Sequence, residues 1–356
     1  MRLPLLLITI CAALITSAAA QPTFHKTWDY PPFGANEVAL YQAMEGTCNK
    51  FQTLPPSRTL NGKKIFGTIG QWQKICQQAL AHTPDKLEAF LQQRLTALPA
   101  NQGKFTGYYK PVLEGSRKRH GPYQTPLVAR PKDLAICNGQ TGQLKPNGAC
   151  RNPYPTRAEI ESNLQDYQVI LWLKDPVDAY FLHIQGSGTV ELDDGSVTHV
   201  GFAAKNGHPY VAIGKVLKDM GELTGTINAD KIRNWLKANP TRNDEVLHAN
   251  PSFIFFRESA QESPGAFGIQ LVAGRSLAVD KSHVPLGLPV IVKTQNTHDN
   301  TPWQRIMFAH DVGSAIKGPA RGDIYFGHGP LAGERAGDQN APGTLQILVP
   351  TENLNK

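Results

Sequence analysis

The feature that most constrains the fold is the segment from residue 250 to the end, in which short apolar runs alternate with turns. The 32 glycines and 27 prolines of the chain supply such turns, and they follow no Gly-X-Y period. Strand candidates in this segment are Ser252–Arg257, Leu288–Thr294, Arg305–Ala309, Ile324–Phe326 and Leu345–Val349. Many short strands joined by glycine and proline turns predict a small β-barrel.

The segment between residues 37 and 95 differs, because its apolar residues recur at helical spacing. One helix is predicted from Glu37 to about Cys48 with Asn36 as its cap, a second over Gly70–Ala81, and a third beginning at Pro84 and reaching Leu95.

The pattern of apolar and turn residues changes again in the middle of the chain. Residues 104–115 look like a strand, and residues 116–165 look rich in loops. Strands are predicted at Tyr167–Leu173, Ala179–Ile184 and Val197–Ala203, the last after an Asp194-Gly195 hairpin turn, and short helices at Val211–Met220 and Ala229–Leu236.

Residues 1–20 have the form of an export signal. Arg2 is the short basic start, an apolar core follows, and Ala18-Ala19-Ala20 precedes a cut at Gln21. Cys11 follows Ile10 rather than the glycine or alanine that lipidation usually needs, so a lipid anchor is not expected. No later run approaches the length of a membrane span.

Four cysteines remain after residue 20, and an even number in an exported chain predicts two disulfides. Cys137 and Cys150 enclose a loop rich in glycine and asparagine, which favours their pairing. Cys48 then pairs with Cys76, although three pairings are formally open. The spacing matches no zinc site, and neither a metal nor a cofactor is predicted.

Composition excludes some classes of protein. With 40% hydrophobic and 18% charged residues, the chain is neither a disordered polyelectrolyte nor a polytopic membrane protein. The net charge of +7 favours an anionic partner: nucleic acid, phospholipid or a carboxylate-bearing polymer. The basic cluster 117–120 could contact nucleic acid, but in an exported chain a solvated loop or contact with anionic cell wall is favoured.

Three aspartates near the C-terminus stand beside glycines and apolar strands. They are Asp280, Asp311 in Asp-Val-Gly-Ser, and Asp323 in Gly-Asp-Ile-Tyr. A single aspartate of this kind is usually a solvated turn residue, whereas three within one short stretch favour a site. Asp311-Val312-Gly313-Ser314 also matches an aspartic-protease loop, but no second copy occurs in the other half of the chain.

Four motifs, occurring in one order along the chain, together indicate a resemblance to a known family. They are Phe105-Thr106-Gly107-Tyr108-Tyr109, His183-Ile184-Gln185-Gly186-Ser187-Gly188, Asn250-Pro251-Ser252-Phe253 and Asp323-Ile324-Tyr325. With them the chain resembles the membrane-bound lytic murein transglycosylase A family, whose C-terminal part is a three-aspartate (3D) domain.

The resemblance implies a mainly β fold with helices, of the α+β class. A double-psi β-barrel with N-terminal helices is built from residues 21–104 and 250–356, a second β domain is inserted at 105–249, and a groove separates the two. The changes of texture near residues 104 and 250 agree with an inserted middle.

The resemblance also implies a reaction. Such exotransglycosylases, carbon–oxygen lyases, cut the MurNAc–GlcNAc β-1,4 bond of peptidoglycan without water and leave a 1,6-anhydro-MurNAc end. A hydrolysing glycosidase generally needs two carboxyl groups. A transglycosylase uses the substrate's own C6 hydroxyl as nucleophile, so that one carboxyl group can serve as acid and then base.

By this resemblance Asp323 is the acid/base, Asp311 its partner, and Asp280 a structural or supporting residue. A general acid must hold its proton near neutral pH, so burial or a like charge must raise the pKa of Asp323 from about 3.9. Asp311 could supply the like charge, and we expect Asp323 inside the groove with Arg321 pointing away.

The substrate-binding candidates are Thr106, Gly107, Tyr108, Gln185, Gly186, Ser187 and Lys317, with Tyr109 beside them. Glycines there would let the backbone approach the glycan closely, and Lys317 would meet substrate carboxylates. The alternatives are that paired tyrosines in a strand are half core and half surface, and that Lys317 is a solvated side chain.

The sequence therefore predicts an exported peptidoglycan lytic transglycosylase, periplasmic or associated with the outer membrane. Its partners would be glycan strands and other cell-wall enzymes, with no nucleic acid. Two alternatives stay open: a non-catalytic peptidoglycan-binding wall protein, and a true hydrolase that uses Asp311 and Asp323 together.

Overall fold

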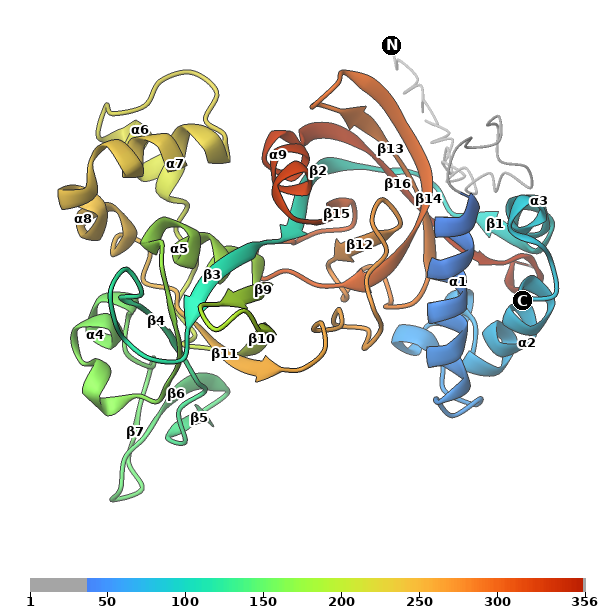
Figure 1. The fold of residues 1–356 in the computed structure, drawn as a ribbon. Coiled ribbons are helices and arrows are strands. Elements are labelled where there is room, and N and C mark those ends of the chain that lie inside the picture. The colour runs from blue at the N-terminus through green and yellow to red at the C-terminus, as the bar shows by residue number, and fades with distance from the viewer. Residues whose placement is uncertain (1–36, 355–356) are drawn as a thin grey trace, which may run out of the picture.

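The computed structural model describes residues 37–354, so the predicted signal and the Asn36 cap lie outside the described residues. Figure 1 shows two bodies: a barrel flanked by N-terminal helices, and a second body of sheets and short helices. Within residues 37–354, the helices are too short or too polar to cross a bilayer.

The first body is a closed β-barrel. Its sheet has the order β1-β16-β13-β14-β12-β15-β2, and β2 also pairs with β16, which closes six strands into a ring. The pairs β12–β14 and β15–β2 are parallel, and the other pairs are antiparallel. The strands are β1 (Leu95–Ala97), β2 (Asn101–Lys110), β12 (Ser276–Val279), β13 (Pro289–Asn296), β14 (Thr301–Asp311), β15 (Arg321–His328) and β16 (Asn340–Pro350).

Three helices pack against this barrel and share its hydrophobic core: α1 (Glu37–Gln52), α2 (Ile69–Ala79) and α3 (Pro84–Arg94). They confirm the predicted N-terminal helices. Thr68 begins α2 with a reciprocal capping box to Gln71, and the disulfide Cys48–Cys76 joins α1 to α2. Leu95, which was assigned to the third helix, has extended backbone angles and begins β1 instead.

The second body has its own sheet, in the order β11-β10-β9-β3-β8-β4, and its own hydrophobic clusters. Those strands are β3 (Val112–Ser116), β4 (Thr125–Val128), β8 (Val169–Leu173), β9 (Ser187–Leu192), β10 (Val197–Lys205) and β11 (Ile254–Ser259). The Asp194-Gly195 turn joins β9 to β10 as predicted, with Gly195 at φ 82°.

The stretch 116–165, predicted to be rich in loops, contains much regular structure. Besides β4 it holds β5 (Leu134–Cys137), β6 (Gln140–Leu144), β7 (Cys150–Arg151) and the helix α4 (Arg157–Ser162). The strands β5, β6 and β7 form a small sheet that the disulfide Cys137–Cys150 ties together. Both disulfide pairings therefore agree with the prediction.

The strand predicted at Ala179–Ile184 is wrong, because these residues belong to helix α5 (Pro176–Gln185). The Asp175 side chain accepts hydrogen bonds from the backbone N–H groups of Val177 and Asp178, and Pro176 occupies the first turn. Gly186 ends the helix at φ 79°, a left-handed conformation that favours glycine. The Asp-Pro start and the glycine end were both readable in the sequence.

The remaining helices are α6 (Ile213–Asp219), α7 (Ala229–Ala238), α8 (Asn243–Leu247) and α9 (Pro330–Asp338). The first three belong to the second body and α9 packs on β2 and β15, beside the second body (Figure 1). The barrel, the second β body and the groove between them confirm the predicted fold class. The domain limits stay a prediction, and β2 continues past residue 104 to Lys110.

Gly107 of β2 is the residue that lets α9 lie against the barrel. A Cβ at this position would come within 2.7 Å of the Ala336 Cα and of the Phe326 ring. Real Cβ atoms do not approach other atoms so closely, so a side chain here would push the helix and the strand apart.

We expect Gly107→Ala to lower the free energy of unfolding by about 1–3 kcal/mol because of this overpacking. Gly46→Ala is the matched control, since Gly46 lies within α1 and its added methyl group would meet only Ile269 Cδ1 at 3.4 Å. The control should be neutral or stabilising by up to about 1 kcal/mol. Urea unfolding measures both, and equal effects of the two variants would contradict the packing argument.

Candidate active site

One row of residues crosses five strands of the barrel. Ala278 of β12 pairs with Asp311 of β14 on one side and with Asp323 of β15 on the other. Asp323 pairs in turn with Thr106 of β2, and Thr106 with Asn340 of β16. Residues directly opposite each other on adjacent strands point to the same face of a sheet. The strand register therefore brings Asp311, Asp323 and Thr106 to one face.

Asp323 is partly buried, and its Oδ1 accepts a hydrogen bond of 2.5 Å from the Thr106 hydroxyl. Burial raises the pKa of Asp323 to about 6. The Thr106 hydrogen bond and the Arg321 charge lower this pKa, and the Asp311 charge raises it further. The effect of burial is the largest, so the carboxyl group holds its proton in mildly acidic solution.

Arg321 does not point away from Asp323, contrary to our expectation. Its Nη2 donates to the Thr106 hydroxyl at 2.8 Å, and its Nη1 donates to the carbonyls of Lys104 and Gly322 at 3.1 and 2.7 Å. The guanidinium therefore bridges β2 and β15 beside the carboxyl group. A strand's alternation would send residues 321 and 323 to one face, which is the signal that was available.

Asp311 has both carboxylate oxygens occupied by hydrogen bonds. Oδ1 accepts from the backbone N–H groups of Ala266 and Val312, each at 2.9 Å, and Oδ2 accepts from the Tyr108 hydroxyl at 3.0 Å. These donors favour the ionised form, although burial still raises the pKa of Asp311 above its ordinary value. Tyr108 is thus a partner of Asp311, and burial together with the Asp311 charge raises its own pKa well above 10.

Lys110 and Tyr325 complete this part of the site, and sequence reasoning missed both as functional candidates. The Lys110 ammonium is buried, lies 3.2 Å from Glu262 Oε2, and donates to the Ser263 carbonyl at 2.9 Å. It also lies 5.9 Å from the centre of the Tyr325 ring, which packs 5.2 Å from the Tyr108 ring. Lys110 directly follows the Phe-Thr-Gly-Tyr-Tyr motif, and that position was the available signal.

Asp280 follows β12, and within residues 37–354 its carboxylate makes no hydrogen bond to these groups. Its Oδ2 accepts the Gly318 N–H at 3.0 Å, and its Oδ1 accepts the Ser282 N–H and hydroxyl. These hydrogen bonds lower the pKa of Asp280 to about 2. The carboxylate therefore fastens the 312–320 connection to the end of β12. Lys317 is exposed on that connection, and its charge contributes to the low pKa of Asp280.

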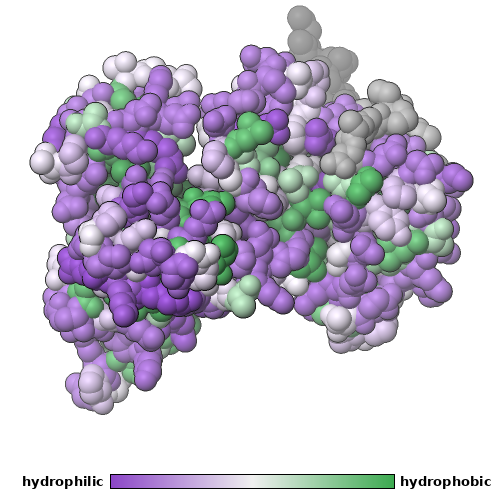
Figure 2. Space-filling view, in the orientation of Figure 1, coloured by the Kyte–Doolittle hydropathy of each residue, from purple (hydrophilic) through white to green (hydrophobic). Residues whose placement is uncertain are grey.

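A cavity of about 790 Å³ lies beside this row, between the barrel and the second body. Figure 2 shows the molecule hollowed between the two bodies. The cavity is lined by β2, α9 and the start of β16 on the barrel side, and by α5, α6 and α7 on the other. Thr106 lines it, and Asp323 lies one hydrogen bond behind Thr106.

The predicted substrate residues divide into two groups. Thr106, Gly107, Tyr109 and Gln185 line the cavity, whereas Tyr108, Gly186, Ser187 and Lys317 do not. Gly186 ends α5, and Ser187 begins β9. A Cβ at Gly107 would meet α9, so this glycine allows helix packing, and its contact with a ligand stays a prediction.

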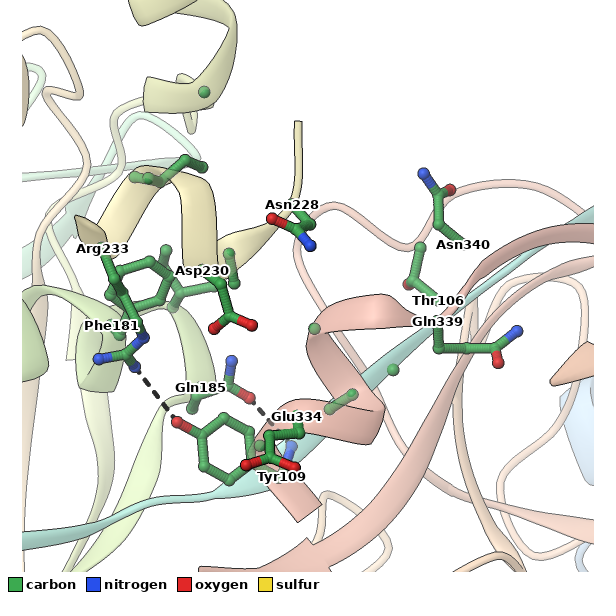
Figure 3. Close-up of a pocket in the computed structure, with 18 of the residues that line it drawn as sticks. Thr106, Tyr109, Phe181, Gln185, Asn228, Asp230, Arg233, Glu334, Gln339 and Asn340 are labelled. Atoms are coloured by element: carbon green, nitrogen blue, oxygen red, sulfur yellow. Dashed lines mark hydrogen bonds between the residues drawn. The ribbon is translucent and has the colours of Figure 1, made fainter. Parts of the chain in front are cut away.

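Tyr109 joins the two bodies at the cavity wall (Figure 3). Its hydroxyl accepts a hydrogen bond from Arg233 Nη2 at 3.2 Å, and its backbone N–H donates to Gln185 Oε1 at 3.1 Å. Arg233 also pairs with Asp178. Gln185 and Arg233 belong to the second body, so these contacts hold it against β2. The wall carries further polar groups at Asn228, Asp230 and Asn340 (Figure 3).

No cluster of three or more histidine, cysteine, aspartate or glutamate side chains suited to a metal occurs within residues 37–354.

Two family models match parts of the chain. Residues 104–257 match the MltA specific insert domain, and residues 275–349 match the 3D domain. Membrane-bound lytic murein transglycosylase A of Escherichia coli K12 is 35% identical over 255 residues. That match covers 69% of this chain but only 65% of the relative's length.

Solved structures are similar over nearly the whole chain. The membrane-bound lytic murein transglycosylase from Agrobacterium tumefaciens has a TM-score of 0.78 and 31% identity, covering 90% of this chain and 94% of that one. E. coli MltA with bound chitohexaose has a TM-score of 0.72 and 27% identity, covering 93% and 95%.

The barrel, the inserted β body and the carboxyl groups at the barrel's groove define a protein that combines a 3D domain with an MltA-type insert. The chain belongs to the lytic murein transglycosylase A family.

Tyr108→Phe removes one donor from Asp311 and keeps the ring that packs on Tyr325. We expect a loss of about 1–2 kcal/mol of stability at a pH at which Asp311 is ionised. The loss should shrink as pH falls through the pKa of Asp311, because the Tyr108 hydroxyl bonds less strongly to a neutral carboxyl group than to a carboxylate. Denaturant unfolding at several pH values measures this.

Tyr123→Phe is the control, since the Tyr123 hydroxyl makes no hydrogen bond within the described residues. A destabilisation by Tyr108→Phe that is the same at every pH would contradict the ionised state of Asp311.

Proposed function

We propose that this protein is a peptidoglycan lytic transglycosylase. It cleaves the MurNAc–GlcNAc β-1,4 bond and forms a 1,6-anhydro-MurNAc end, with Asp323 as its single acid/base. The observation that carries this proposal is the buried Asp323 carboxyl, with a pKa of about 6, one hydrogen bond from a cavity that the two bodies share. Family membership supports the same activity.

The reaction needs one proton to be given and then taken back. Asp323 donates its proton to the glycosidic oxygen as the bond from that oxygen to C1 of MurNAc breaks. The C6 hydroxyl of the same MurNAc then bonds to C1, and the Asp323 carboxylate takes its proton. The carboxyl group returns to its starting state and no water is consumed. A pKa near 6 suits both steps, because the group is a fair acid and a fair base near neutral pH.

Asp311 supports this scheme as a charged neighbour rather than as a second catalytic base. Three donors bond to its oxygens and favour its charged form, although burial raises its pKa. A hydrolase of two carboxyl groups would need the second one to activate water or to attack C1. The negative charge of Asp311 raises the pKa of Asp323 and would stabilise positive charge developing at C1.

We propose a glycan strand as the substrate, in the groove between a barrel formed by residues 21–104 and 250–356 and an insert formed by residues 105–249. Thr106, Gly107, Gln185 and Tyr109 line the cavity, and a relative was crystallised with bound chitohexaose. Contacts of Tyr108, Gly186, Ser187 and Lys317 with the strand belong to the proposal, as do a place in the cell envelope and other cell-wall enzymes as partners.

Asp323→Asn and Asp323→Ala test the acid/base. We expect anhydro-muropeptides from sacculi digested by the wild type and a decrease of at least about 10²-fold in both variants. Mass spectrometry of the products separates anhydro ends from the reducing MurNAc ends of a hydrolase. Asp166→Asn is a matched control, because Asp166 is exposed and does not line the cavity. If both Asp323 variants still form these products, another residue is the acid/base. If the wild type binds sacculi and forms no products, the protein is a non-catalytic wall-binding protein.

The pH dependence tests the state of the acid. Free enzyme needs Asp323 protonated, so kcat/KM should fall above a pH of about 6 and approach a tenfold loss per further pH unit. Initial rates of release of anhydro-muropeptides from pH 4.5 to 8.5 measure this. A profile that stays level through pH 8 would refute Asp323 as the proton donor.

A further inference from the structure

The hydrogen bonds around Thr106 have a definite direction. Arg321 Nη2 is always a donor, and it donates to the Thr106 oxygen at 2.8 Å. The hydroxyl has one hydrogen atom, and that hydrogen is donated to Asp323 Oδ1 at 2.5 Å. Arg321 cannot reverse its role, because a guanidinium carries no acceptor. The chain of donors therefore runs from Arg321 through Thr106 to Asp323.

This direction distinguishes the two oxygens of Asp323. Oδ1 has to accept, because the Thr106 hydrogen points at it. Oδ2 makes no hydrogen bond to any residue from 37 to 354. A proton on Oδ1 would face the Thr106 hydrogen, whereas a proton on Oδ2 meets no competing donor.

We propose that Arg321 and Thr106 are positioning residues for Asp323: they hold its Oδ1 as an acceptor, so that the acid proton is carried on Oδ2. The inference rests on the proposed function, in which that proton is given to the glycosidic oxygen. Arg321 is itself fixed by the carbonyls of Lys104 and Gly322, so the pair is preorganised by the β2–β15 pairing.

The same pair offsets the effect of burial on the acid. A hydrogen bond to the carboxylate and a nearby positive charge both favour ionisation, against burial and the charge of Asp311. Without the pair, Asp323 would hold its proton to higher pH and would be a weaker acid. The charged and titratable groups that surround Asp323 are Arg321 and Tyr325 on β15, Asp311 on β14 and Tyr108 on β2, with Lys110 and Glu262 behind them.

Thr106→Val and Thr106→Ser form the matched pair that tests this. Valine keeps the shape of threonine and removes the hydroxyl, whereas serine keeps the hydroxyl. The pKa of Asp323 is measured without substrate, by ¹³C NMR of aspartate-labelled protein with Asp323→Asn to assign the resonance. We expect this pKa to rise on the order of one unit in Thr106→Val and to stay within a few tenths in Thr106→Ser.

Kinetics separate positioning from substrate binding. In Thr106→Val the fall of kcat/KM should begin at a pH on the order of one unit higher, and kcat should drop while KM stays within about twofold. A rise in KM with an unshifted pH profile would instead make Thr106 a substrate contact and overturn the inference. Thr344→Val is the control in the same barrel, since Thr344 pairs with Gln102 and not with the Asp323 row.

If Thr106→Val fails to fold, Arg321→Gln tests the positioning role instead. It should raise the pKa of Asp323 as well, and an unchanged pKa would overturn the inference. Failure here and failure of the proposed function are distinguishable. The NMR shift without anhydro products from the wild type refutes only the function. Anhydro products with no shift in either variant refute only the positioning pair.

Discussion

The parallel pairing of β2 with β15 is the contact on which the rest of the structure depends. β2 lies near the start of the described chain and β15 near its end, and their pairing, together with that of β2 with β16, closes the barrel. The same register sets Thr106 opposite Asp323 and gives Arg321 its backbone acceptors. Beyond Lys110 the chain leaves this pairing for the second body, so the strand that completes the site also leads to the far wall of the cavity.

Asp311 and Asp323 lie on one face of the barrel but have different surroundings. Asp311 accepts two backbone donors and a tyrosine hydroxyl, which favour its charged form. Asp323 accepts one hydroxyl and is buried beside that charge, so that it holds a proton to a pH of about 6. The difference arises from the number of donors that the fold supplies to each group, which is how one barrel face can hold an acid and a negative charge together.

Much of the fold was readable from local sequence. The spacing of apolar residues predicted the N-terminal helices, and the Asp194-Gly195 turn predicted the hairpin of β9 and β10. The segment predicted as a strand is helix α5, because its Asp-Pro start and glycine end favour a helix more strongly than its apolar run favours a strand. The prediction that Arg321 points away is wrong for a different reason. Strand alternation indicates that residues 321 and 323 share a face, but the partners of Arg321, a backbone carbonyl and a hydroxyl on the neighbouring strand, come from the tertiary structure.

The sequence by itself determined the residue types of the site and favoured the β-barrel class and the disulfide pairs, because strand length, turns and cysteine spacing are local properties of the chain. Only the tertiary structure decided what each residue does. Asp280, Asp311 and Asp323 look alike in sequence. In the structure Asp280 fastens a loop, Asp311 accepts donors that favour its charged form, and Asp323 keeps its proton up to a pH of about 6. Gly107 leaves room for the packing of α9, which no local pattern in the sequence shows. Burial and hydrogen-bond donors set these roles, and both come from strands and loops distant in the chain.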